Sequence, residues 1–173
     1  AGYTLLWDPE AVESCVEAGV GERVTLTIGG WGDDHHGEPI EGVTGYVRAI
    51  TDGTFTNTGT SHDGAGTVTR LGRAVRFECG SNDGVTVILT ENRAMSFDRE
   101  IWRHVGIQPE RLDVIAVPSV AAVRGDYGPT ASRIVEVDSP GLGSPLVEWE
   151  ELTRVTRPKF PVDDMADDAY PDW

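Results

Sequence analysis

The residues best suited to chemistry stand together in an Asp-Asp-His-His run at positions 33–36. Carboxylate and imidazole groups are ligands for ions such as Zn²⁺ or Mn²⁺. Adjacent loop residues rarely converge on one ion, however, and no third ligand follows at a recognisable spacing. Three interpretations therefore stay open. In the first, which we favour, the run forms a polar turn. In the second it contributes to a site completed elsewhere, and in the third it binds a metal.

Arg124 is a second candidate, because it follows the expected end of a buried strand. An arginine there can hold a carboxylate with two parallel hydrogen bonds. It can equally form a structural ion pair with Asp113 or Asp126, which we favour. The sequence contains no GxSxG, HExxH or P-loop motif. These residues alone do not make a complete active site, and we expect the isolated chain to bind no catalytic zinc.

Charge limits the class of partner. The chain has 173 residues, with 29 acidic against 14 basic side chains and a net charge of −15. Such a chain is repelled by nucleic acid and by anionic membranes, so we expect neither as a partner. Lys159 is the only lysine. An acidic chain nearly free of lysine suggests a halophilic source, with an acidic protein from a high-GC genome as the alternative.

The two cysteines and the hydropathy pattern indicate the compartment. Cys15 and Cys79 have no paired spacing and no histidine motif nearby, as expected for buried thiols in a reducing environment. No apolar run is long enough to cross a membrane. We expect a cytoplasmic protein.

The elements that must position these residues predict an α+β fold. Alternating apolar residues predict an antiparallel β-rich body at 22–90, with strands near 24–28, 40–50, 55, 68–71, 74–79 and 85–90. A small βαβ unit is expected at 112–137, with strands at 112–117 and 134–137 around a helix at 127–133.

The first residues predict a strand and a helix. Residues 3–7 form an apolar run, and Asp8-Pro9 is a typical helix start, with Gly19 or Gly21 as the stop. No strand precedes this unit, so it resembles the last unit of a sheet in an absent α/β domain. We expect residues 1–20 to dock against another polypeptide, and the alternative is that they fold onto the chain's own β body.

A resemblance to a known family rests on short strings in order between residues 4 and 162. They are LWDPEAV at 6–12, EAGVG at 17–21, GG at 29–30 with Asp33, HGEP at 36–39, DGTFTN at 52–57, LGR at 71–73, VILTENR at 87–93, FD at 97–98, GI at 106–107, VEVD at 135–138 and PGL at 140–142. Together they resemble the C-terminal domain of the MlrC-like (microcystinase C) family.

The resemblance implies the C-terminal portion of a zinc metallopeptidase or amidohydrolase acting on small peptides or amides. Its zinc and catalytic residues are expected in an N-terminal domain, which is the expected partner as a domain or a subunit. This chain would then wall the active site. The alternative is a non-catalytic binding or assembly domain. The substrate- or interface-lining candidates are Asp33, His36, Asn57, Arg93, Ser119 and Arg124.

One stretch departs from the family pattern. Where the family commonly shows KSxxHFR, Pro118 and Ala122 replace the lysine and histidine, while Ser119 and Arg124 match. A different substrate or a lost activity is therefore expected, and microcystin is a poor choice of substrate. We expect one family domain at 1–162, divided into 1–21, 22–90, 91–138 and an irregular extension at 139–162, and an acidic tail at 163–173.

Overall fold

The computed structural model describes residues 1–30, 37–59, 64–80, 84–94, 98–119, 123–139, 154–157 and 163. The chain divides into two compact units, Ala1–Leu142 and Gly143–Trp173. In the second unit, Arg157 forms an ion pair with Asp163 at 2.8 Å. The expected extension at 139–162 and tail at 163–173 lie almost wholly outside the described residues.

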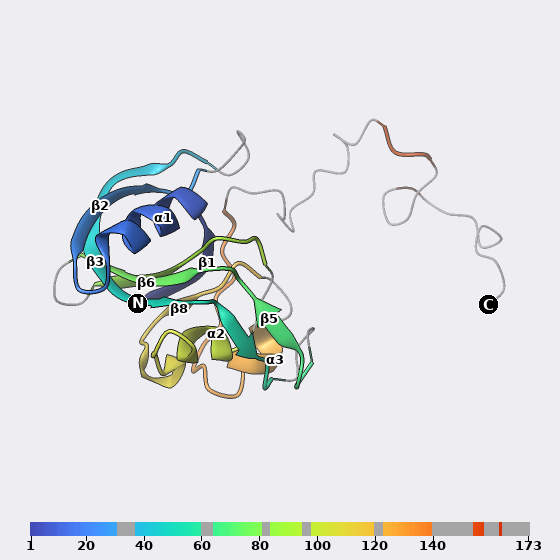
Figure 1. The fold of residues 1–173 in the computed structure, drawn as a ribbon. Coiled ribbons are helices and arrows are strands. Elements are labelled where there is room, and N and C mark those ends of the chain that lie inside the picture. The colour runs from blue at the N-terminus through green and yellow to red at the C-terminus, as the bar shows by residue number, and fades with distance from the viewer. Residues whose placement is uncertain are drawn as a thin grey trace. The chain divides into compact units, whose positions relative to one another are not determined.

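The first unit is built on a six-stranded sheet with the order β2-β3-β6-β7-β1-β8, and a two-stranded sheet of β4 and β5 (Figure 1). Three short helical segments and one longer helix complete it. The elements are β1 (Gly2–Trp7), α1 (Pro9–Ala18), β2 (Arg23–Ile28), β3 (Ile40–Thr51), β4 (Thr54–Thr56), β5 (Val68–Arg70), β6 (Ala74–Cys79), β7 (Val85–Thr90), α2 (Glu100–Arg103), the 3₁₀ helix η1 (Pro109–Arg111), β8 (Ile115–Ala116) and α3 (Val123–Tyr127).

The antiparallel body is confirmed. β2, β3, β6 and β7 pair in succession as antiparallel neighbours. In β2, whose apolar and polar residues alternate, every second side chain toward the end of the strand is buried. In β7 nearly every side chain is buried, as in a strand that is covered on both faces. Helical segments accompany this sheet on both of its faces, so the fold class is α+β as expected.

Residues 2–18 fold onto the chain's own β body, which is the alternative that we considered for them. β1 lies between β7 and β8 and is parallel to both, with Tyr3 opposite Val87 and Trp7 opposite Thr90. The helix that follows buries Val12 and Cys15 completely in the core of this chain. The first strand is therefore not an unpaired edge, because β7 and β8 pair with it on its two sides.

The expected βαβ unit is only half present. The first strand contracts to Ile115–Ala116, and the helix lies at Val123–Tyr127 rather than at 127–133. Residues 134–137 do not form a strand, and Val135 and Val137 are 62% and 77% exposed. The alternation of these residues predicted a strand, and that prediction is wrong: among the described residues they pair with no strand, and the two valines are exposed.

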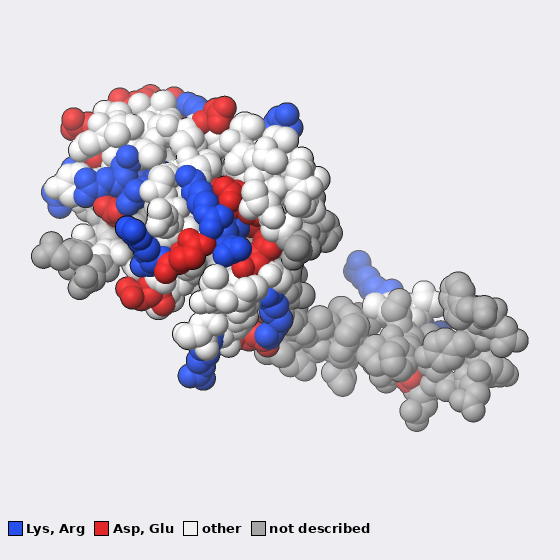
Figure 2. Space-filling view, turned by 90° about the horizontal axis from the view of Figure 1, so that it is seen from below, with Lys and Arg blue, Asp and Glu red and all other residues white. Residues whose placement is uncertain are grey.

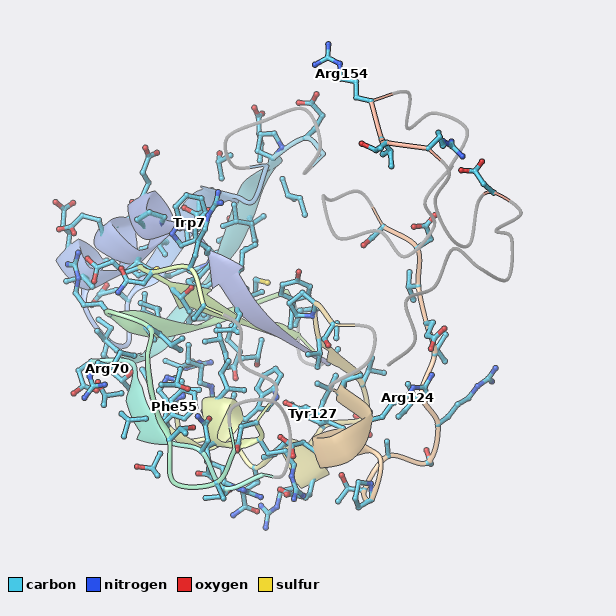
Figure 3. All side chains as sticks on the ribbon, turned by 90° about the vertical axis from the view of Figure 1, so that its right-hand side faces the viewer. Trp7, Phe55, Arg70, Arg124, Tyr127 and Arg154 are labelled. Atoms are coloured by element: carbon cyan, nitrogen blue, oxygen red, sulfur yellow. The ribbon has the colours of Figure 1, made fainter. Side chains whose placement is uncertain are left out.

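Two hydrophobic cores lie on opposite faces of the six-stranded sheet. The first joins α1 to β2, β3, β6 and β7. The second joins α2 and α3 to the other face and includes the β4–β5 hairpin residue Phe55. In Figure 3, Trp7 lies on the side of α1, whereas Phe55 and Tyr127 lie on the other side. We call these the α1 face and the α2 face.

Ion pairs cover the surface around α2. Arg103 bonds Glu100 at 2.6 Å and Glu110 at 2.5 Å, and Arg99 also reaches Glu110. Figure 2 shows arginines and carboxylates interleaved on the side seen from below. Within the described residues, no helix combines the length and apolar character that a bilayer crossing requires.

Candidate functional site

A groove of about 1010 Å³ opens on the α1 face, beyond the part of the sheet that α1 covers. It forms where β1, the end of β2, the start of β3 and the ends of β6 and β7 meet. Most of its described walls are apolar or aromatic, and Glu38 and Arg93 are the charged residues among them. Its walls include Tyr3, Leu6, Trp7, Ile28, Val43 and Val87.

A β-bulge in β1 aims side chains into this groove. Three steps along β1, from Tyr3 to Leu6, correspond to two steps along β7, from Val87 to Leu89. The extra residue is Leu5, the one described non-glycine residue with a positive φ, at 53°. Tyr3 and Leu6 consequently both pack with the α1-face core. Leu5 packs with the opposite core and also contributes to the groove wall. A left-handed leucine costs about 1–3 kcal/mol, and such strain concentrates at functional sites.

Asp8 fixes the end of the groove where α1 begins. Its side chain is 2% exposed, and Oδ1 accepts the backbone N–H of Ala11 at 3.0 Å as the helix N-cap. The other oxygen, Oδ2, accepts the N–H of Gly29 at 3.2 Å. One carboxylate thus ties the start of α1 to the end of β2.

Gly30 is required for the backbone path next to the groove. Its φ is +66°, and a Cβ there would lie 2.4 Å from the backbone nitrogen of Pro39. Only glycine allows this close approach. The chain therefore enters the segment 31–36 at Gly30 and returns near Pro39 at the same end of the groove.

Trp7 and Arg93 form the most defined polar feature. The indole Nε1 of Trp7 donates a hydrogen bond to the carbonyl oxygen of Glu91 at 3.1 Å. The guanidinium of Arg93 lies 4.0 Å from the centre of the Trp7 ring, in a cation–π contact. Arg93 is exposed, and it has no ion pair with any residue that the structure describes.

The neighbouring arginine is engaged quite differently. Arg73 bonds Glu91 and Glu13, each at 2.7 Å. The side-chain hydrogen bond from Arg73 lowers the pKa of the Glu91 carboxyl, which stays ionised and matched to Arg73. Glu91 is consequently not a counter-ion for Arg93.

The cysteine, tyrosine and threonine side chains among the described groove walls are not activated for reaction. Burial raises the pKa of the Cys79 thiol and of the Tyr3 hydroxyl, so both are neutral near pH 7. The Cys79 thiol also bonds the carbonyl of Val85 at 3.4 Å. Thr90 donates its hydroxyl to the carbonyl of Asn92 at 3.1 Å. None of these groups is an activated nucleophile.

The structure describes four of the six sequence candidates and does not bring these four together at the groove. Arg93 lines the groove. Asp33 and His36 lie outside the described residues, although Gly30 and Glu38, on either side of them, line the groove. Asn57, Ser119 and Arg124 are not among its described walls.

The three remaining candidates have local contacts of their own. Asn57 is 2% exposed, and its amide donates to the hydroxyls of Thr67 and Thr69 at 2.9 Å each. Arg124 pairs with Glu136, whereas we had considered Asp113 or Asp126 as its partner. Ser119 is half-buried next to a turn in which its N–H bonds the carbonyl of Val117.

Sequence reasoning missed the tyrosine and tryptophan of β1 as site residues. The apolar run at residues 3–7 was interpreted only as a buried strand. The available signal was its two aromatic side chains, because Tyr and Trp combine an apolar body with a polar atom and are frequent in binding surfaces.

The described residues do not fit a metal site. They contain no group of three or more His, Cys, Asp or Glu side chains that could hold an ion. A catalytic zinc site generally takes three protein ligands and leaves one position open. No step of chemistry is therefore derived through a metal held by these residues.

Three comparisons with known proteins agree with one another. The family model described as MlrC C-terminus matches residues 1–154. Microcystinase C of a Sphingomonas species is 28% identical over 157 residues, which are 91% of this chain and 29% of that protein. A provisionally named metallopeptidase of Mesorhizobium sp. BNC1 has a TM-score of 0.76 and 26% identity, covering 95% of this chain and 32% of that one. The chain thus spans about a third of these relatives' length.

Proposed function

Because the chain belongs to the MlrC C-terminal family, we propose that it is the C-terminal portion of a zinc-dependent amidohydrolase or peptidase. The substrates are small peptides or amides. In this proposal the groove on the α1 face walls an active site whose metal belongs to an N-terminal portion, as a domain or a separate subunit.

One observation carries this proposal: three strings that are distant in sequence meet at the groove. Trp7 comes from the first, Gly29 and Gly30 from the second, and Thr90 with Arg93 from the third. These are the same strings that carry the family resemblance. Binding sites are typically concave and mostly apolar with a few polar groups, and this groove, in which the three strings meet, has that composition.

The division of labour follows from the side chains present. The described residues offer an apolar trough and a cation, but no ligand set for a metal. We assign the metal, which activates water or polarises the amide carbonyl, to the N-terminal portion. This chain binds the substrate, orients it and keeps water away from its apolar parts.

The alternative is a non-catalytic binding or assembly domain. Pro118 and Ala122, which stand where the family commonly has lysine and histidine, favour this alternative, because neither can donate a hydrogen bond from its side chain. The two functions differ in one measurable property, which is hydrolysis by the assembled protein.

The test uses the longer protein that contains this chain together with its N-terminal portion. Loaded with zinc, it should hydrolyse short peptide amides, and neither this chain alone nor the N-terminal portion alone should do so at a comparable rate. Hydrolysis by the N-terminal portion alone at the full rate would overturn the role of the groove. No hydrolysis of any short peptide or amide by the zinc-loaded protein would favour the binding domain.

We further propose a salt-rich cytoplasm as the setting. The net charge of −15 and the single lysine support this, because concentrated salt screens the repulsion among carboxylates. The melting temperature should then rise steadily from 0.1 M to 2 M KCl. A melting temperature that falls over this range contradicts the proposal.

A further inference from the structure

We propose that the groove on the α1 face binds a molecule that carries a carboxylate next to a bulky apolar group, with Arg93 as the carboxylate contact. The inference deepens the proposed function, on which it rests, by naming the chemistry of the substrate. It is argued from the walls of the groove, the state of Arg93 and the charges around it.

The apolar part of the ligand follows from the walls. A volume of about 1010 Å³ is at the upper end of what ligand pockets usually enclose, about 300–1000 Å³. The bulge in β1 places Tyr3 and Leu6 on the same face, next to Val43 and Val87. At the margin, Ile40 and Val85 are 63% and 42% exposed, so apolar surface is left in contact with solvent.

The carboxylate part follows from Arg93. Its planar guanidinium is held against the Trp7 ring, and that ring is itself held by the hydrogen bond to Glu91. A stacked guanidinium keeps its N–H groups in the plane, where they can bond both oxygens of one carboxylate. Because the side chain is already ordered by stacking, binding an anion sacrifices little further rotamer freedom.

The surrounding charges leave Arg93 available. Arg73 is occupied by Glu91 and Glu13, and Arg48 and Arg76 both bond Glu78. Arg93 is different, since no residue of the described chain forms an ion pair with it, in a protein whose net charge is −15.

Glu38 is the other charged side chain among the described walls. It disfavours a second anionic group at the end of the groove where the chain returns from residues 31–36. The fitting ligand therefore carries one carboxylate, at the Arg93 end, and a neutral or cationic group toward Glu38.

The experiment titrates this chain with three probes by calorimetry. N-acetyl-phenylalanine has the carboxylate and the apolar ring, N-acetyl-phenylalanine amide lacks the charge, and acetate lacks the ring. We expect the acid to bind at least tenfold more tightly than the amide or acetate. Charge-assisted hydrogen bonds are strong enough to produce such a ratio.

Variants locate the effect. Arg93→Gln should weaken binding of the acid about tenfold and leave binding of the amide unchanged. Arg93→Lys should bind the acid with an affinity between those of the unchanged protein and Arg93→Gln, because lysine keeps the charge but loses the planar fork. Arg70→Gln is the matched control, since Arg70 is exposed on β5 and outside the groove (Figure 3). Unchanged thermal melting confirms that each variant is folded.

Three results would overturn the inference: no binding of the acid at millimolar concentration, equal binding of the acid and the amide, or unchanged acid binding in Arg93→Gln. The test needs no catalysis, so it is separate from the test of the proposed function. Failed binding with intact hydrolysis refutes the ligand chemistry alone, and intact binding without hydrolysis refutes the enzyme.

Discussion

The two faces of the central sheet are covered to different extents. On the α2 face, Trp102, Ile101 and Leu71 are completely buried, and helices and hairpin close over the strands. On the α1 face, a single ten-residue helix buries Val12 and Cys15, and the sheet beyond it is open as the groove.

The difference shows where this fold obtains its stability and where it keeps a surface for function. A completely packed face stabilises the fold through the burial of apolar side chains, and close packing restricts the size and shape of those side chains. A half-covered face gives up part of that burial and retains strain at Leu5, which is consistent with selection for binding. Substitutions on the α2 face should therefore change stability, and those in the groove should change binding.

Trp102→Ala should have the largest effect. The side chain is 0% exposed, and its Nε1 donates to the Tyr127 hydroxyl at 3.1 Å. Removing the indole leaves a large cavity and should lower the free energy of unfolding by about 3–5 kcal/mol, measured by urea denaturation. Trp102→Phe, which retains most of the ring, should cost less. A loss below 1 kcal/mol for the alanine variant would show that the α2 face is not the stability core.

Asp8→Ala should rank second, because it removes a carboxylate that accepts two backbone N–H groups, that of Ala11 in the first turn of α1 and that of Gly29 after β2. We expect a loss of about 1–3 kcal/mol in the free energy of unfolding. Glu10→Ala, in the same first turn but exposed, is the control and should change little. If the two substitutions lowered the free energy of unfolding equally, Asp8 would not be the residue that connects the helix to the end of β2.

His104 should make the α2 face sensitive to pH. Burial lowers the pKa of His104 below its usual value, although the carbonyls of Ile101 and Glu100 and the carboxylate of Asp52 oppose this shift. Its ring nitrogens have no hydrogen-bond partner among the described residues, and the ring lies 4.9 Å from that of Phe55. The folded state thus favours the neutral ring.

The sign of the effect follows from proton binding. Between the lowered folded pKa and the unfolded value of about 6.5, the unfolded chain binds more protons, so stability falls as the pH falls through this range. His104→Phe should flatten that part of the profile, measured as the free energy of unfolding from pH 7.5 to pH 5. An unchanged slope in the variant would exclude His104 as its source.

Ile40→Ser should have the smallest effect on stability. The side chain is 63% exposed at the margin of the groove, so the change should stay within about 0.5 kcal/mol. The same substitution should weaken binding of an apolar carboxylate by calorimetry. A large loss of stability with unchanged binding would mean that the groove is part of the packed core.

Much of the fold was predictable because its signals are local. The strands β6 and β7 begin and end where alternating and continuous apolar residues indicate, and Asp8-Pro9 marks the start of α1. The partners of β1 were not predictable in this way. Its pairing with β7 joins residues far apart in sequence, and such parallel contacts leave no short-range pattern.

The candidate site was predictable only in part. Arg93 came from the family resemblance and lies in the groove. The bulge at Leu5 could not be foreseen, because no glycine marks it, and it places Tyr3 and Leu6 against the same core. Asn57 shows the converse: the family resemblance made it a candidate, but its amide is occupied within the β4–β5 hairpin.

The central claim is that the groove on the α1 face is the surface that acts on substrate. The most direct test measures kcat/KM for a peptide amide with a free carboxylate, using the zinc-loaded longer protein with Arg93→Gln or Arg70→Gln. We predict that Arg93→Gln lowers kcat/KM about tenfold, chiefly through KM and without a change in melting temperature, and that Arg70→Gln has no effect. Equal kcat/KM values for the two variants would contradict the claim.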